Sequence, residues 1–258
     1  MGVYEIRDRD EAVSIMVDKA NIAADTIKNN YDCCVAYYDE HLLEISIEQR
    51  RLLGEFEPAL QNDEFVMYLQ PQVKRDGAAK GAEALVRWVH PSRGILTPYA
   101  FIDILENAGL IYKLDLYIWE KAAQKLAEWK EKGYGSYHIS VNISTKDFYI
   151  IDIYETFTGL INKYGIAASN LHLEITETTL MTDFEKNMNI IHKLQGVGFR
   201  VEIDDFGSGY SSLNMLKDIS ADVLKIDMGF LRKSENEVKG QDLSLIHISE
   251  PTRPEPIS

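Results

Sequence analysis

Cysteine is almost absent from this chain of 258 residues, which contains only Cys33 and Cys34. Two adjacent cysteines suit neither a structural disulfide nor a zinc site. We interpret them as small residues in a buried strand of a protein from a reducing compartment. The sequence therefore predicts a cytoplasmic protein.

Long hydrophobic runs and an excess of positive charge are absent as well. No apolar segment approaches the length of a membrane span, and the polar start at residues 1–7 is not a signal peptide. The chain has 27 basic and 41 acidic residues, for a formal net charge of −14. We predict no membrane segment in this chain and no nucleic-acid polymer as a partner. An anionic substrate would need metal ions or a local basic group to hold it.

The hydrophobic content of 45% allows a sizeable core in one large or two smaller domains. Apolar residues at three- and four-residue steps predict a helix over residues 10–29, followed by a short strand at 33–38. Residues 42–60 are charged and helix-prone. They are expected to form a connecting helix, either a signal-transmitting spacer or an ordinary solvated linker.

From Glu64 onward, strand-like and helix-like patterns alternate, which predicts a mostly parallel sheet with helices packed outside. A (β/α) barrel carries its reactive residues at the carboxyl ends of the strands, where the polar residues of this chain gather. An open doubly wound sheet is the alternative. It would normally offer a Gly-rich phosphate turn after its first strand, and none is present. The expected strands contain residues 65–69, 82–88, 138–142, 171–176, 201–205 and 223–227, and the expected helices cover 99–108, 114–130, 151–164 and 184–194, with a short helix after Tyr210.

Five of these apolar strands carry charged or amide side chains near their ends. The oxygen donors are Glu83, Asn142, Glu174, Asp204 and Asp205. Hard oxygen ligands favour Mg²⁺ or Mn²⁺ over zinc or copper. Carboxylates that converge in one cavity repel each other, and two divalent ions would relieve that repulsion and create the arrangement used in phosphodiester hydrolysis. Lys225 would lie close to these metals and orient the attacking water or stabilise charge on the phosphate.

Each of these residues also has an ordinary structural interpretation. Asp204 and Asp205 could cap the turn that follows their strand, and Glu174 could form a buried pair with Lys225 or Arg87. The segment 204–210 contains two glycines and is either a mobile loop over the metals or a tight connector. Independent structural roles would have to arise on five strands at once, so the joint pattern favours a site.

Several stretches, in order and well spaced, resemble the EAL domain, a phosphodiesterase family that hydrolyses cyclic di-GMP to a linear dinucleotide. The matching stretches are Tyr68-Leu69-Gln70-Pro71, Glu83-Ala84-Leu85-Val86-Arg87-Trp88, Ser140-Val141-Asn142-Ile143-Ser144, Leu173-Glu174-Ile175-Thr176-Glu177, Asp204-Asp205-Phe206-Gly207-Ser208-Gly209-Tyr210-Ser211-Ser212-Leu213 and Leu224-Lys225-Ile226-Asp227. The resemblance implies a TIM-like (β/α) barrel and cyclic di-GMP as the ligand.

The same resemblance implies a role for each matching residue. A first Mg²⁺ or Mn²⁺ would be bound by Glu83, Asn142, Glu174 and Asp204, and a second by Asp204 and Asp205. Lys225 would serve the attacking water, and Glu177 would hold the glycine loop in place. The implied substrate contacts are Gln70, Leu85, Arg87 and Asp227. A homodimer through the EAL domain is expected, and a receptor that binds cyclic di-GMP without hydrolysing it is the alternative function.

The resemblance also divides the chain into segments. Residues 1–41 resemble the C-terminal end of a GGDEF domain, 42–60 form the linker helix and 61–242 form the EAL domain. After Phe230 the family's next Ala-Glu-Gly-type strand and its Gln-Gly segment are missing. We therefore expect a barrel that is incomplete at its C-terminus, and an inactive fragment of an active parent. Residues 243–258 resemble the translation of a sequencing adapter and are predicted to be non-native, with a genuine disordered tail as the alternative.

Overall fold

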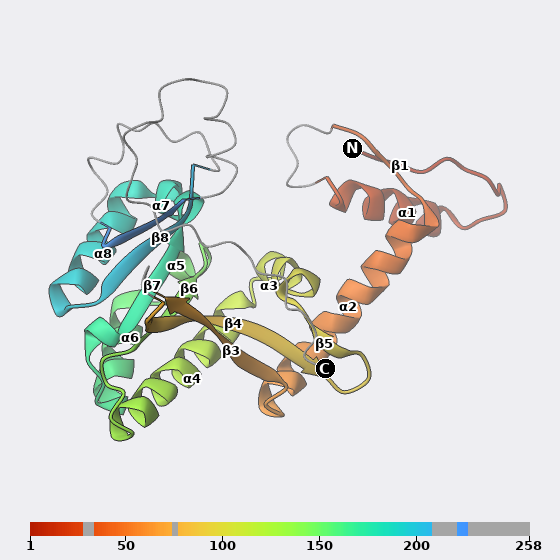
Figure 1. Cartoon of the computed structure of the whole chain (residues 1–258). Coiled ribbons are helices and arrows are strands. Elements are labelled where there is room, and N and C mark those ends of the chain that lie inside the picture. Colours follow the sequence, from red (N-terminus) through yellow and green to blue (C-terminus); the bar gives the residue numbers. More distant parts are fainter. Residues whose placement is uncertain (28–33, 74–76, 208–220, 227–258) are drawn as a thin grey trace.

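A mixed β-sheet lies at the centre of the molecule, with helices packed against it (Figure 1). This computed structural model describes residues 1–27, 34–73, 77–207 and 221–226. Within them the sheet has the strand order β3-β4-β6-β7-β8-β9, and the short β5 pairs with β4. The strands are β3 (Phe65–Val73), β4 (Ala79–His90), β5 (Gly94–Leu96), β6 (His138–Ile143), β7 (Leu171–Thr176), β8 (Arg200–Phe206) and β9 (Val223–Ile226).

The pairings from β4 to β9 are all parallel, as the alternation of strands and helices predicts. Their carboxyl ends therefore meet at one edge of the sheet. β3 and β5 instead run antiparallel to β4, because each is joined to it by a connection too short for a crossover helix. Among the described strands, β3 and β9 lie at opposite ends of the strand order.

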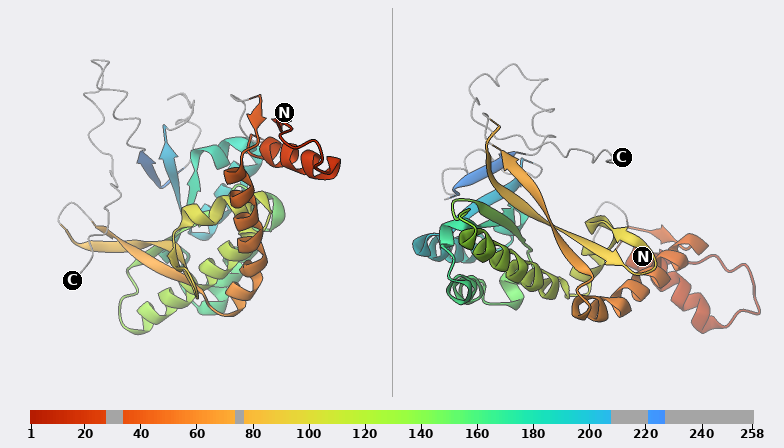
Figure 2. Two further views of the ribbon diagram at one scale, coloured as in Figure 1. Left: turned by 90° about the vertical axis from the view of Figure 1, so that its right-hand side faces the viewer. Right: turned by 60° about the horizontal axis from the view of Figure 1, so that its bottom comes forward.

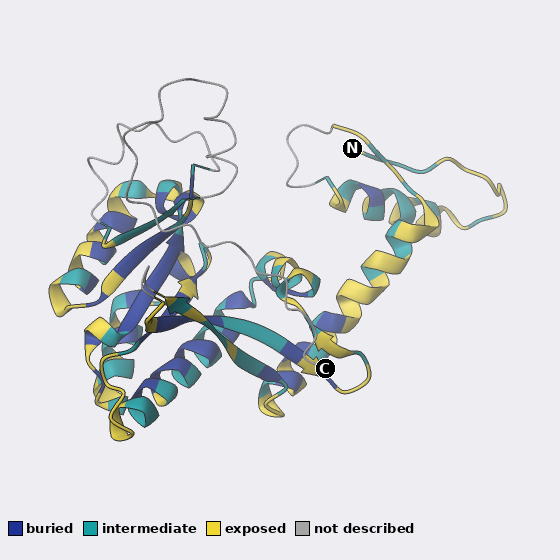
Figure 3. Ribbon diagram, viewed as in Figure 1, coloured by how far each residue is buried: buried dark blue, intermediate teal, exposed yellow. Residues whose placement is uncertain are grey.

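The two faces of the central strands differ in chemistry. Every second residue is apolar and fully buried, for example Val141, Leu173 and Val201, and these positions face the packed helices. The intervening residues are polar, because successive side chains of a strand point to opposite faces. Figure 3 shows β6, β7 and β8 as the most buried part of the molecule. The polar face is therefore an interior surface, and it carries the candidate site.

Most helices follow a strand and lead back to the next one. Local signals fix their ends: Asp152 caps α6 by accepting a hydrogen bond from the backbone N–H of Glu155, and Gly165 ends it with a φ of 61°. Six α-helices of the described part belong to the sheet region: α3 (Ile102–Asn107), α4 (Ile111–Glu131), α5 (Asp147–Ile150), α6 (Ile153–Tyr164), α7 (Glu177–Thr182) and α8 (Phe184–Val197). Two short 3-10 helices, η1 (Pro98–Ala100) and η2 (Ala168–Asn170), complete them.

The structure divides one of the expected helices and adds a short helix before another. The segment 99–108 forms η1 and then α3, and the segment 151–164 is preceded by the separate short helix α5. Ser144 and Asp147 explain the extra turn: their side chains and backbone N–H groups hydrogen-bond reciprocally, in the manner of a capping box. The helix expected after Tyr210 and the segment 243–258 lie outside the described residues.

The N-terminal part is small. β1 (Gly2–Val3) and β2 (Ala36–Tyr37) form a parallel pair against which α1 (Val13–Asp25) packs. The interpretation of the cysteines as buried strand residues is wrong for Cys34, which is exposed and precedes a strand of only two residues. Cys33 lies outside the described residues.

The helix α2 (Glu40–Gln61) connects this part to the sheet (Figure 2). Its second half buries Leu52, Phe56 and Ala59, and the Phe56 ring lies 5.7 Å from that of Phe65 on β3. The expected solvated linker is therefore docked along half of its length. No helix in the described ranges is both long and apolar enough to cross a membrane.

Candidate functional site

The register of the parallel strands brings the predicted polar residues onto one face of the sheet. Asn142 is the Cα partner of Glu174, which in turn pairs with Glu202, and Glu83 pairs with Ser140. Partners in a sheet point to the same side. Side chains that lie tens of residues apart in the sequence therefore share one interior surface.

Lys225 on β9 is the centre of this surface. Its side chain is 11% exposed, and its Nζ donates to the Glu174 carboxylate and lies 3.4 Å from Oε2 of Glu83. A third carboxylate, Glu202, has Oε2 3.7 Å from the same nitrogen. Burial lowers the pKa of Lys225, and the Glu83 carboxylate offsets part of that effect. The predicted catalytic lysine thus lies among acidic side chains from three strands.

The acidic groups form a set that would accept cations. Burial raises the pKa of Asp204 to about 6, and the negative charges of Asp205, Glu83 and Glu202 act in the same direction. Glu174 is buried, and its Oε2 has no hydrogen-bond partner among the described residues. A buried acceptor without a donor and a carboxylate that is costly to ionise both indicate missing positive charge. The donor set fits hard divalent cations such as Mg²⁺ or Mn²⁺.

Asp205 follows Asp204 with a φ of 54°, in the left-handed region that non-glycine residues seldom adopt. The β8–β9 register shifts between Ile203 and Phe206, so the backbone bulges here. The exposed Asp205 side chain consequently departs from strict strand alternation. The side chains of two successive acidic residues, Asp204 and Asp205, can therefore lie on the same side of the strand.

Asn142, the predicted amide ligand, ends the same row of strand positions. Its backbone oxygen accepts a hydrogen bond of 2.9 Å from the indole Nε1 of Trp119, which ties the end of β6 to α4. With Leu85 and Thr176, it also lines a cavity of about 470 Å³, which Glu106 of α3 and Asp115 and Trp119 of α4 line from the helix side. None of the carboxylates proposed as metal ligands lines this cavity.

The predicted substrate contacts lie on the β3–β4 hairpin. Gln70 is the Cα partner of Glu83, and Tyr68 that of Leu85. The Arg87 guanidinium donates to the Val86 carbonyl oxygen at 2.8 Å and lies 5.7 Å from the Tyr68 ring centroid. The hairpin therefore places these residues beside the acidic set. Asp227 lies outside the described residues.

Glu177 follows β7 at the start of α7 and is buried. Its Oε2 accepts a hydrogen bond of 2.6 Å from the backbone N–H of Gly207. This contact joins α7 to Gly207, at the beginning of the glycine loop. The resemblance to the EAL family implies that Glu177 contacts this loop. The effect of Glu177 on loop behaviour stays a prediction, because residues 208–220 lie outside the described residues.

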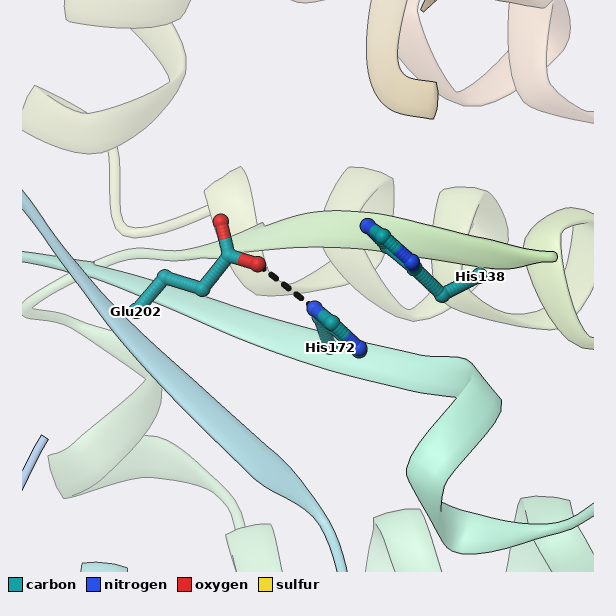
Figure 4. Close-up of side chains that lie close together, drawn as sticks. All are labelled: His138, His172 and Glu202. Atoms are coloured by element: carbon teal, nitrogen blue, oxygen red, sulfur yellow. Dashed lines mark hydrogen bonds and ion pairs between the residues drawn. The ribbon is translucent and has the colours of Figure 1, made fainter. Parts of the chain in front are cut away.

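Sequence reasoning missed a buried polar chain beneath these residues (Figure 4). Nδ1 of His172 lies 2.6 Å from Oε1 of Glu202, and the His172 ring stacks on the His138 ring with 3.7 Å between centroids. Nε2 of His138 lies 2.7 Å from Oε1 of Gln72. Burial, with a smaller contribution from His172, lowers the pKa of His138 to about 4, so this ring is neutral near pH 7. Polar residues alternating with apolar ones on neighbouring strands were the available signal.

His138, His172 and Glu202 offer ligand atoms within 4.8 Å of one another, close enough to hold a metal ion. However, the imidazole planes differ by only 2°, so the in-plane lone pairs of the two rings run parallel rather than toward one point. The geometry therefore favours a hydrogen-bonded chain, and the oxygen-rich group around Glu174 fits a cation better.

The parallel strands, with acidic residues on one face, are the arrangement of an α/β enzyme domain with an acidic site. The family model of the EAL domain matches residues 54–245, and the chain belongs to that family. This confirms the resemblance found in the sequence motifs and the predicted fold class, since an EAL domain is a TIM-like barrel.

Two curated relatives illustrate the similarity. The chain is 33% identical over 212 residues to the bifunctional diguanylate cyclase/cyclic di-GMP phosphodiesterase MucR of Pseudomonas aeruginosa, covering 82% of this chain and 30% of that protein. It is 32% identical over 185 residues to the cyclic di-GMP phosphodiesterase PdeR of Escherichia coli, covering 72% of this chain and 28% of that protein. The chain thus spans a third or less of the length of these relatives.

Solved structures agree with this assignment. A MucR phosphodiesterase in complex with cyclic di-GMP is 34% identical, with a TM-score of 0.67, covering 72% of this chain and 76% of that one. The EAL enzyme Bd1971, bound to cAMP and cyclic di-GMP, is 26% identical, also with a TM-score of 0.67, covering 87% of this chain and 58% of that one. The expected GGDEF remnant, linker boundaries, truncation and non-native tail stay predictions.

Proposed function

We propose that the parent protein of this chain is a metal-dependent phosphodiesterase that hydrolyses cyclic di-GMP to linear pGpG in bacterial signalling, and that this chain carries most of its catalytic site. The observation that carries the proposal is the convergence of Lys225 with Glu83, Glu174 and Asp204 at the carboxyl ends of the strands in an EAL domain. The cytoplasm, where this nucleotide acts, is the proposed location.

The acidic residues would hold two divalent cations, Mg²⁺ or Mn²⁺. We assign the first to Glu83, Asn142, Glu174 and Asp204, and the second to Asp204 and Asp205. When bound, the cations would neutralise the phosphate and lower the pKa of water. Oε2 of the buried Glu174, which has no donor among the described residues, supports this assignment, because a cation would satisfy it.

The protein residues would orient the reaction. Lys225 would hold the attacking water in line with phosphorus, and Gln70, Leu85, Arg87 and Asp227 would contact the dinucleotide. The water oxygen forms a bond to phosphorus while the bond from phosphorus to the ribose 3′ oxygen breaks. The leaving oxygen takes up a proton, and the phosphate stays on the 5′ oxygen of the linear product.

A receptor that binds without hydrolysis is the second candidate, and one observation favours it. Lys225 already pairs with Glu83 and Glu174. Its ammonium group therefore neutralises part of the negative charge that the cations would otherwise neutralise. A lysine that kept this position would leave a pocket for cyclic di-GMP without a complete metal site.

The test incubates the purified full-length parent protein with cyclic di-GMP in Mn²⁺, Mg²⁺ or EDTA and separates the products by chromatography. The enzyme proposal requires pGpG with either cation and none with EDTA, and Glu83→Ala should abolish it. Binding of cyclic di-GMP without product would support the receptor instead. Absence of both binding and hydrolysis would exclude the two functions for the parent protein, and the predicted homodimer can be measured on the same sample by light scattering.

A further inference from the structure

Glu202 is a buried carboxylate that has no assigned role in the proposed reaction. It lies in the middle of β8, is only 2% exposed, and pairs in register with Glu174 on one side and Val223 on the other. A carboxylate at such a position is costly unless it is paired, so its partners indicate why it is there.

The two oxygens of Glu202 have different partners. Oε1 lies 2.6 Å from Nδ1 of His172 and 3.3 Å from Oγ of Ser140, which donates to it. Oε2 faces Lys225, whose Nζ lies 3.7 Å away. The His138 ring stacks parallel to the His172 ring, 3.7 Å from it between centroids (Figure 4). One oxygen is therefore fixed by β6 and β7, and the other is directed at the lysine.

Lys225 has three carboxylates around it, and the cations would remove two of them as partners. Glu83 and Glu174 are proposed metal ligands, and a carboxylate that binds a divalent cation no longer attracts an ammonium group strongly. The cations would also repel Lys225 directly. Glu202 remains, since its Oε1 is engaged by His172 and Ser140 and its Oε2 points to Lys225.

The charges agree with this arrangement. Within the described ranges the group contains five carboxylates, namely Glu83, Glu174, Glu202, Asp204 and Asp205. Two divalent cations and one ammonium group would balance five negative charges. Without Glu202, the loaded site would carry an uncompensated positive charge next to Lys225, which would favour movement of the lysine away from the reacting water.

We infer that Glu202 is a positioning residue, held by His172 and Ser140, that keeps Lys225 in place when cations occupy Glu83 and Glu174. The inference rests on the proposed function. It requires Lys225 to shift from the Glu174 carboxylate toward Oε2 of Glu202 when the site is loaded, a movement of its flexible side chain only.

Two substitutions separate a role in charge from a role in packing. Glu202→Gln keeps the shape and removes the charge, whereas Glu202→Asp keeps the charge and leaves a gap. If Glu202 holds Lys225 by charge, Gln should lower kcat by roughly ten- to a hundredfold, with KM and Mn²⁺ affinity nearly unchanged, and Asp should retain more activity than Gln. The matched control is Glu185→Gln on the exposed side of α8, which should behave as the wild type.

A crystal structure of the full-length parent protein with Ca²⁺ and cyclic di-GMP provides the readout that is independent of turnover. The inference expects Nζ of Lys225 within about 3 Å of Oε2 of Glu202, a hydrogen-bonded ion pair. A loaded site in which Lys225 stays on Glu83 or Glu174, or a Gln variant as active as the wild type, would overturn the inference and leave the proposed function intact. Failure to bind any cation would overturn the proposed function, and the inference with it.

Discussion

Among single residues, Lys225 separates catalysis from binding most clearly. It contacts carboxylates but is not an oxygen ligand, so Lys225→Ala should leave Mn²⁺ and cyclic di-GMP binding nearly intact. Turnover should fall by roughly two to four decades, the scale of a lost positioning or proton-transfer group. Isothermal titration and product chromatography measure the two effects. Lys193→Ala, on an exposed position of α8, is the control for loss of a positive charge. Normal turnover in Lys225→Ala would show that the assigned role is wrong.

Glu83 should behave differently, because its substitution removes a proposed ligand oxygen. We expect Glu83→Ala to lose Mn²⁺ affinity and activity together, by at least about tenfold each, the range for a disturbed metal site. Glu83→Gln keeps the side-chain volume and should show the same coupled loss. Titration with Mn²⁺ before and after substitution checks this prediction, and an unchanged affinity would contradict the proposed ligand set.

At the scale of elements, α2 is attached to the sheet by one apolar face and several ion pairs. Phe56 is fully buried against Phe65. The Glu55 carboxylate accepts a hydrogen bond of 2.9 Å from Nε2 of the buried His90, whose Nδ1 accepts from the backbone N–H of Ser92. Phe56→Ala should reduce the free energy of unfolding by about 3–5 kcal/mol, the cost of removing a buried aromatic side chain. Denaturant unfolding measures it. Ile47→Ala on the same helix is the control, since Ile47 is 57% exposed and should change stability little.

A second connection between elements depends on pH. Asp115 on α4 and Asp147 on α5 form a carboxyl pair, and burial raises the pKa of both, with the Asp147 charge adding to the effect on Asp115. Asp147 accepts from Ser144 through Oδ2, and its buried Oδ1 has no other partner in the described ranges. A proton retained by Asp115 would supply the missing donor.

The sign of the pH effect follows from these raised values. The stability from the shared proton is fully present below the unfolded-state pKa of about 4 and is lost as the pH rises through the folded-state pKa. Asp115→Asn supplies a permanent donor, so its stability relative to the wild type should increase with pH, by about 1–3 kcal/mol at pH 8. Unfolding at pH 5, 6.5 and 8 tests this. The exposed Asp103→Asn is the control, and a difference that does not vary with pH would contradict the shared proton.

At the scale of the whole molecule, cation binding should stabilise the fold, because the unfolded chain cannot assemble five carboxylates from three strands. At a Mn²⁺ concentration a hundred times the dissociation constant, the gain would be about 2.7 kcal/mol. Thermal unfolding with and without Mn²⁺ should show a rise in Tm that EDTA reverses and that is lost in Glu83→Ala. An unchanged Tm in the wild type would count against the metal site.

The sequence predicted the repeating part of the fold and the acidic residues, because both depend on local patterns. Alternation marks which side chains of a strand share a face, and family motifs identified Glu83, Glu174 and Lys225. The stacking of His138 on His172 was missed, since it depends on the register between two strands that no local pattern specifies. The docking of α2 was missed for a similar reason. Its apolar residues look like those of any amphipathic helix until the sheet they contact is known.

The left-handed backbone of Asp205 has a consequence for how natural variants of this domain should be interpreted. A φ of 54° is tolerated by glycine and asparagine and is costly for branched residues, by about 1–2 kcal/mol or more. A lineage that gave up catalysis would still have to preserve the shape of this bulge. Its position 205 should therefore drift first to Asn or Gly, which lack the charge but fit the turn. An Asn at this position would indicate that catalytic activity has been lost in a protein that still folds. It would identify an inactive homologue more reliably than a substitution on a regular strand.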